Sequence, residues 1–151
     1  MKVGPADPRA PGCAALLAQS HALMQAMFAP GECHYLDIDA LTGPDIRFVA
    51  ATEDGETLGT GALALRDGYA EVKSMFTAPA ARGRGVADAI LRHLIDLAAR
   101  EGRPLLRLET GTGLDAAHRL YARHGFVPCG PFGGYRAHPA SLFFERSPDF
   151  S

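Results

Sequence analysis

The segment Arg82-Gly83-Arg84-Gly85-Val86-Ala87 constrains the fold of this chain more than any other. It follows a stretch with strand-like alternation and opens a stretch with helical periodicity. Glycine lets the backbone turn sharply and approach a ligand closely. The free N–H groups and the dipole of a helix N-terminus favour an anion, and the two arginines add positive charge. The segment therefore predicts a phosphate or pyrophosphate site between a strand and a helix.

The same segment excludes two common nucleotide-binding loops. It is not a Walker A loop, because no Gly-Lys-Ser/Thr follows it. It is not a dinucleotide fingerprint, because the third glycine is missing and the three preceding strands look antiparallel. A tight strand-to-helix connection with two solvated arginines remains the open alternative.

Apolar periodicity on both sides of this loop predicts a single α/β domain over residues 1–151 with a mixed sheet. Prolines 5, 8 and 11 predict an extended or irregular start. The stretch 32–43 is mixed and is compatible with a short helix or a lid. Helices are expected over 13–28, 86–100 and 115–124, and strands over 46–51, 58–65, 70–77, 105–110, 127–129 and 141–145.

Composition excludes several classes of function. The formal net charge is −2, from 15 Lys and Arg against 17 Asp and Glu, so we expect neither a nucleic-acid nor a membrane partner. No apolar run approaches the ~20 residues of a membrane helix, and the start has no apolar signal region. Cys13, Cys33 and Cys129 form no CxxC pair, which predicts reduced thiols in the cytoplasm and no metal site.

Two motifs resemble the GNAT superfamily of N-acetyltransferases. Its pyrophosphate motif, Arg/Gln-x-x-Gly-x-Gly/Ala, is matched at Arg82, Gly85 and Ala87. Its later Ala-x-x-Leu-Tyr-x-x-x-Gly-Phe motif is matched over 117–126. The resemblance is strong from about Ile46 onward. It implies an α/β (α+β) fold with a mixed, mostly antiparallel sheet of about six to seven strands, flanked by helices and splayed in the middle to hold acetyl-CoA.

The resemblance also implies an activity. The segments 71–75, 108–111 and 129–132 look like a small-molecule branch of bacterial acetyltransferases. We therefore expect acetyl-CoA-dependent transfer of an acetyl group to the amine of a small molecule, directly and through a ternary complex. A protein N-terminal or lysine acetyltransferase and a non-catalytic CoA-binding module remain alternatives, and a homodimer is left open.

The family assigns roles to residues that match its motifs. By resemblance, Tyr121 is the candidate acid for the CoA thiolate, although a purely core aromatic is the alternative. Glu71 is the favoured base, and Glu109 is an alternative base or an amine-binding group. The expected cofactor-binding residues are Met75, Phe76, Thr77, Arg82, Gly83, Arg84, Gly85, Val86, Ala87 and Tyr121.

Strand alternation places Glu71, Lys73 and Met75 on one face of the predicted strand 70–77. An ion pair with Lys73 would lower the pKa of Glu71 and weaken it as a base, and an exposed surface pair is the alternative.

Other candidates lie outside the motifs. Leu114 stands where many family members have Asn, and the adjacent Asp115 could cap the following helix instead. Tyr135 and Ser141 are candidates for closing the acceptor pocket. Surface positions are expected for the histidines His34, His118, His124 and His138.

Overall fold

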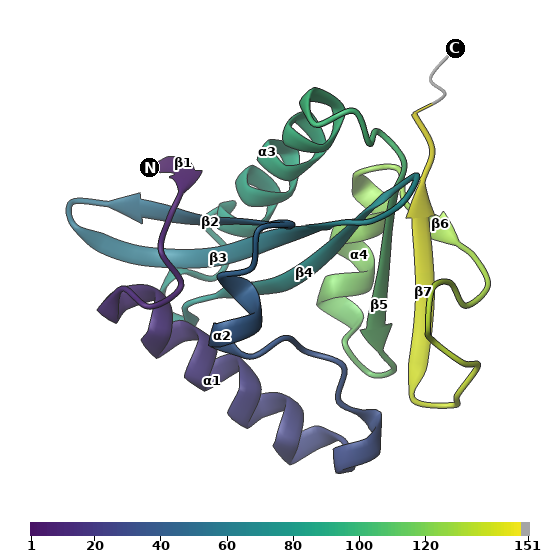
Figure 1. Ribbon diagram of the computed structural model, residues 1–151. Helices are drawn as coiled ribbons and strands as arrows, with labels where there is room; N and C mark the ends of the chain where they lie inside the picture. The colour runs from purple at the N-terminus through teal and green to yellow at the C-terminus, as the bar shows by residue number, and fades with distance from the viewer. Residues whose placement is uncertain (149–151) are drawn as a thin grey trace.

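A seven-stranded sheet in the order β1-β2-β3-β4-β5-β7-β6 runs through the molecule (Figure 1). The computed structural model describes residues 1–148. Among the strands of these residues, only β4 and β5 are parallel, and the other neighbouring pairs are antiparallel, in agreement with the predicted mostly antiparallel sheet. The strands are β1 (Lys2–Pro5), β2 (Ile46–Glu53), β3 (Glu56–Leu65), β4 (Ala70–Thr77), β5 (Leu106–Gly111), β6 (Val127–Pro128) and β7 (Ser141–Arg146).

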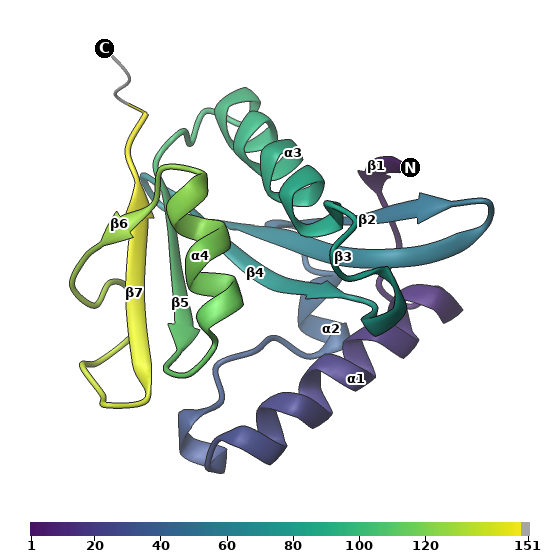
Figure 2. The same cartoon turned by 180° about the vertical axis from the view of Figure 1, so that it is seen from behind.

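Helices cover both faces of the sheet (Figure 1 and Figure 2). One face carries α1 (Pro11–Met27) and α2 (Ile38–Leu41), and the other carries α3 (Val86–Arg100) and α4 (Asp115–Arg123). Short 3₁₀ turns, η1 (Pro30–Glu32) and η2 (Pro79–Ala81), precede α2 and α3. Within residues 1–148, no helix combines the length and hydropathy needed to span a membrane.

The proline-rich start forms the edge strand β1, which pairs with β2 from Lys2 opposite Thr52 to Pro5 opposite Val49. Proline lacks a backbone N–H, so it is tolerated in a sheet mainly at an edge. The sequence predicted an extended or irregular start, and it is the pairing with β2 that makes this segment a strand.

Helix α3 packs closely against the sheet at two glycines of β3. Its apolar stripe, including Val86, Ile90 and Leu94, is buried against β3 and β4. Glycine in β3 permits this approach: a Cβ at Gly59 would lie 2.8 Å from Val86, and one at Gly61 would lie 2.6 Å from Ile90. The close packing positions the N-terminus of α3 beside the end of β4.

A β-bulge in β4 changes which side chains share a face. Phe76 pairs with Thr60 and Lys73 pairs with Ala62, so Ser74 and Met75 together face a single residue of β3. Ser74 has a φ of 57°, in the left-handed region, and such an extra residue is what defines a bulge. The predicted alternation was therefore wrong beyond Lys73. Met75 packs against the α3 side, away from the face of Glu71 and Lys73.

The parallel strands β4 and β5 separate soon after they meet. They pair only at Ala70 with Leu106 and at Glu71 with Arg107. Beyond this point the two ribbons diverge, as Figure 1 shows. This confirms the predicted splay in the middle of the sheet, and it leaves the backbone edge of β4 beyond Glu71 without β5 as a neighbour.

Replacing Gly61 by alanine is expected to destabilise the fold by about 1–3 kcal/mol, the usual cost of inserting a methyl group into a close-packed interior. Its Cβ would contact Ile90, Met75 and Leu94 at 2.6–3.2 Å. Gly4→Ala is the matched strand control, because its Cβ meets no atom within 4 Å. Urea denaturation measures both, and equal stabilities of the two variants would contradict the close approach of α3.

Candidate functional site

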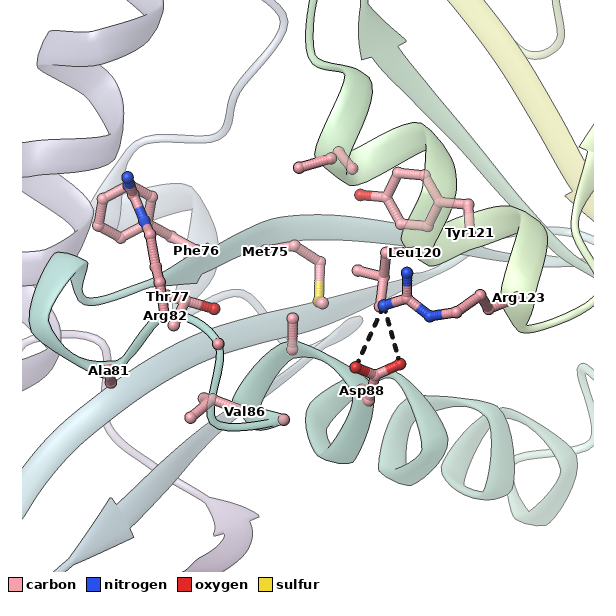
Figure 3. A pocket seen from close by; sticks show the side chains of 15 residues that line it. Met75, Phe76, Thr77, Ala81, Arg82, Val86, Asp88, Leu120, Tyr121 and Arg123 are labelled. Carbon is pink, nitrogen blue, oxygen red and sulfur yellow. Dashed lines mark hydrogen bonds and ion pairs between the residues drawn. The ribbon is translucent and has the colours of Figure 1, made fainter.

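The predicted phosphate-binding segment forms one wall of a cavity of about 430 Å³, which we call the loop cavity (Figure 3). Gly83 and Gly85 have φ angles of 79° and 78°, and a Cβ at either would meet no atom within 4 Å. Gly85 is the N-cap of α3 and no side chain caps that helix. The first N–H groups of α3 are therefore available to an anion in open space above the two glycines.

The two arginines of the segment point in different directions. Arg82 lines the loop cavity, with its guanidinium carbon 5.9 Å from the ring centroid of Phe76. Arg84 forms an ion pair with Glu53 at the end of β2 and does not line the cavity. Every other predicted cofactor-binding residue lines it, from Met75 on β4 to Tyr121 on α4.

An ion-pair cluster ties α3 to α4 beside the loop cavity (Figure 3). Asp88 on α3 accepts hydrogen bonds from Arg123 at 3.2 Å and lies 2.9 Å from His124. Burial disfavours the charged carboxylate, but these hydrogen bonds and charges outweigh it and lower the pKa of Asp88. The cluster holds the two helices at a defined separation across the cavity.

Tyr121 lies where the loop cavity meets a second, smaller cavity. It is 7% exposed, packs against Phe126 and Phe144, and directs its hydroxyl towards the space between α4 and β4 (Figure 3). Burial, with a smaller contribution from the charge of Glu109, raises the pKa of Tyr121 to about 12. The hydroxyl therefore stays protonated at neutral pH and can donate a hydrogen bond.

The second cavity, about 140 Å³, contains Glu109 from β5 and is called the Glu109 cavity. Met75, Ala117 and Tyr121 line both this cavity and the loop cavity, so the two adjoin. Burial raises the pKa of Glu109, although a hydrogen bond from Ser141 and nearby positive charge oppose the shift. A carboxylate with a raised pKa is suited to accept a proton near neutral pH.

Glu71 is buried in a network of charged and aromatic side chains. Its carboxylate lies 3.3 Å from Arg66 and 3.4 Å from Lys73, and it accepts a hydrogen bond from the Tyr135 hydroxyl. Lys73 also donates to the backbone oxygen of His34 at 2.7 Å and to Tyr135 at 3.0 Å. The predicted Glu71–Lys73 pair is confirmed, but the pair is buried and not at the surface.

This network borders a third cavity, about 730 Å³, which we call the Glu71 cavity. His34 lines both the Glu71 cavity and the Glu109 cavity. Tyr135, expected to help close the acceptor pocket, lines the Glu71 cavity. The contacts of Arg66 and of the His34 carbonyl could not be identified from the sequence, because they join residues 5 to 64 positions apart and follow no local pattern.

The start of α4 differs from the prediction. Leu114 is the N-cap and no side chain caps the helix, so the expectation that Asp115 would cap it was wrong. Asp115 instead lies in the first turn, where its negative charge interacts favourably with the helix dipole.

Three of the four histidines are half-buried and not at the surface as expected. His118 hydrogen-bonds the Gly111 carbonyl at 2.9 Å, His124 contacts Asp88, and His34 packs edge-on against Tyr135. Only His138 among them is exposed.

Comparison with known proteins matches this arrangement to one family. The sequence pattern of the acetyltransferase (GNAT) family matches residues 16–126. The chain is 42% identical to the uncharacterized N-acetyltransferase YedL of Escherichia coli K12, covering 89% of this chain and 87% of YedL. It is 43% identical to the IAA acetyltransferase of Azospirillum brasilense, covering 75% of each chain.

A solved structure agrees with the sequence matches. A Klebsiella pneumoniae protein assigned as an acyl-CoA N-acyltransferase superposes with a TM-score of 0.80 at 27% identity, covering 96% of this chain and 95% of that chain. The loop at the start of α3, the Tyr121 motif and the splayed sheet thus occur together in a chain that matches the family over most of its length. The chain belongs to the acetyltransferase (GNAT) family and is an acyltransferase.

Proposed function

We propose that this protein transfers an acetyl group from acetyl-CoA directly to the amine of a small molecule, within a ternary complex. One observation carries the proposal: the loop cavity and the Glu109 cavity adjoin at Tyr121. A thioester in the first and an amine in the second would meet at that junction. Since a thioester is already activated, orienting the two reactants supplies much of the rate enhancement and no covalent enzyme intermediate is required.

The loop cavity suits the CoA end of the reaction. The uncapped N-terminus of α3 favours the pyrophosphate, and Arg82 adds a positive charge at the same wall. The pantetheine arm would extend along Met75, Phe76 and Thr77, where β4 has separated from β5 and its backbone groups are free to pair with a ligand. Backbone donors there could also stabilise the oxyanion that develops on the thioester.

We propose Glu109 rather than Glu71 as the group that accepts the proton of the amine. Both oxygens of Glu71 are already engaged, one by Arg66 and the other by Tyr135 and Lys73. Glu109 lies in the same cavity as Tyr121, and its raised pKa makes its carboxylate the better proton acceptor. Glu71 then orients the wall of the acceptor site.

Tyr121 is the proposed donor to the departing thiolate. Its protonated hydroxyl stands at the junction of the two cavities, where the bond between carbon and sulfur would break. A hydrogen bond or a proton from this group would stabilise the sulfur as the amine nitrogen forms its bond to the acetyl carbon.

One relative favours a small acceptor over a protein. It is the IAA acetyltransferase, whose name gives the compound IAA as its acceptor. The volume of the Glu109 cavity also limits the size of the group that reaches the junction. A screen of amines with acetyl-CoA, followed by release of the CoA thiol, tests the activity as a whole. CoA binding without thiol release from any amine would instead indicate the non-catalytic alternative.

The first prediction concerns the loop. Gly85→Val should weaken CoA binding at least about 10-fold by calorimetry, because its side chain would fill the space above the α3 N-terminus. Gly68→Val is the matched control, since Gly68 also has a positive φ, 83°, and open space but lies in the turn between β3 and β4. Unchanged CoA affinity in folded Gly85→Val protein would exclude this loop as the binding site.

The second prediction concerns Tyr121. Tyr121→Phe removes only the hydroxyl, so kcat should fall at least about 10-fold while CoA affinity stays nearly the same. Steady-state kinetics and calorimetry measure the two effects separately. Wild-type turnover in this variant would show that Tyr121 only packs in the hydrophobic core and takes no part in the reaction.

The third prediction concerns the base. Activity should rise with pH as the Glu109 carboxyl loses its proton, and Glu109→Gln should lower kcat about 100-fold and remove this acidic limb. Glu71→Gln should mainly raise KM for the amine. The reverse pattern in the two pH–rate profiles would assign the base to Glu71.

A stability measurement separates this loss of activity from unfolding. Because the fold raises the pKa of Glu109, ionisation of this carboxyl lowers the free energy of unfolding, beginning above its ordinary pKa and reaching the full effect above the raised pKa. Glu109→Gln should therefore be at least as stable as the wild type at neutral pH, and any advantage should disappear at acidic pH.

A further inference from the structure

The Glu71 cavity lies next to the proposed transfer site but differs from it in charge. Arg66 and Arg136 both line this cavity, and neither lines the Glu109 cavity. The Glu109 cavity is lined instead by one carboxylate, Glu109, and one ammonium group, Lys73, together with Tyr121. Since His34 lines both cavities, a single molecule could extend from one to the other.

The charges around the Glu71 cavity do not cancel. Arg66 and Arg136 line this cavity beside the single carboxylate of Glu71, which also pairs with Lys73 from the side of the Glu109 cavity. Arg136 is exposed and forms no ion pair with any residue in the described range 1–148. The lining of the cavity therefore carries an excess of positive charge, and both oxygens of Glu71 are already engaged.

Tyr69 and Tyr135 contribute aromatic rings to the lining of this cavity, and Phe132 packs behind them. Tyr135 packs edge-on against Phe132 at 5.2 Å, and Phe132 packs in the same way against Tyr69 at 5.6 Å. Arg107 lies 4.9 Å from the Tyr69 ring and pairs with Glu145, so its charge is already engaged.

We propose that the acceptor is an aminocarboxylate, with its amine at Glu109 and its carboxylate held by Arg66 and Arg136. This inference rests on the proposed function and specifies its acceptor. A guanidinium binds a carboxylate through two parallel hydrogen bonds, which fixes orientation as well as charge. Arg66 directs only one nitrogen to Glu71, at 3.3 Å, so other donors of its fork remain for a ligand. An acceptor of this polarity would be oriented with its amine towards the thioester.

Matched acceptors test the proposal. We choose 4-(aminomethyl)benzoate and 5-aminopentanoate, each beside its neutral carboxamide, because the remote group changes charge with little change in shape. Release of the CoA thiol gives kcat/KM for each pair. The carboxylate member of at least one pair should be used at least about 10-fold better than its carboxamide. An analogue of 5-aminopentanoate with a phosphonate in place of the carboxylate distinguishes a general anion site from a carboxylate site.

Variants connect this preference to the two arginines. Arg136→Met and Arg66→Met should each raise KM for the carboxylate acceptor at least about 10-fold and leave KM for acetyl-CoA and for the carboxamide unchanged. Arg136→Met is the cleaner variant, because Arg66 also contacts Glu71. Arg92→Met removes the same charge from an exposed position on α3 and should change none of these values.

Equal use of the carboxylate and the carboxamide in both pairs would overturn the proposal, as would a KM for the carboxylate that neither arginine variant alters. Better use of the phosphonate than of the carboxylate would overturn it in favour of a phosphate-like acceptor. Acetyl transfer to some other amine would leave the proposed function standing in each of these cases. If no amine releases thiol from bound acetyl-CoA, both proposals fail together.

Discussion

The early separation of β4 from β5 is the constraint on which the candidate site depends. Two parallel strands that stayed paired would satisfy each other's backbone groups and leave no room for a ligand between them. Here pairing ends at Glu71 and Arg107, and the bulge at Ser74 then reorients the rest of β4. Thr60 supports the bulge by donating its hydroxyl hydrogen to the Ser74 carbonyl at 2.8 Å. The cavities beside β4 thus depend on two departures from regular pairing, the early end of the β4–β5 pairing and the bulge opposite β3.

The helices on either side of the sheet contribute to the site in different ways. Because β3 carries Gly59 and Gly61, α3 lies close to the sheet and presents its N-terminus at the end of β4. Helix α4 packs beside the open edge and contributes Tyr121, and Asp88 ties the two helices together through Arg123 and His124. On the opposite face, the segment after α1 contacts the sheet at His34, whose backbone carbonyl accepts a hydrogen bond from Lys73. Each side of the site is therefore held by contacts that are distant in sequence.

Much of this could be predicted from local pattern. The helix over 86–100 and the strand over 70–77 have the predicted bounds, because their periodicities are strong and their ends carry Gly or Pro signals. The bulge could not be predicted, since serine rarely adopts a positive φ and nothing nearby in sequence requires it. Its absence from the prediction placed Met75 on the wrong face. The start at Lys2–Pro5 became a strand only because β2 offered an unpaired edge.

What the sequence by itself determined is the part of the site built from contiguous residues: the two-glycine loop, the amphipathic helix it opens, and the Tyr121 motif. Backbone conformation and helix polarity are local properties, so neighbouring residues suffice to specify them. Only the tertiary structure decided how Glu71 and Glu109 differ. Burial among Arg66, Lys73 and Tyr135 engages Glu71, whereas burial beside Tyr121 raises the pKa of Glu109. Desolvation and charge pairing depend on which side chains surround a group in space, and those neighbours come from strands and loops that only folding brings together.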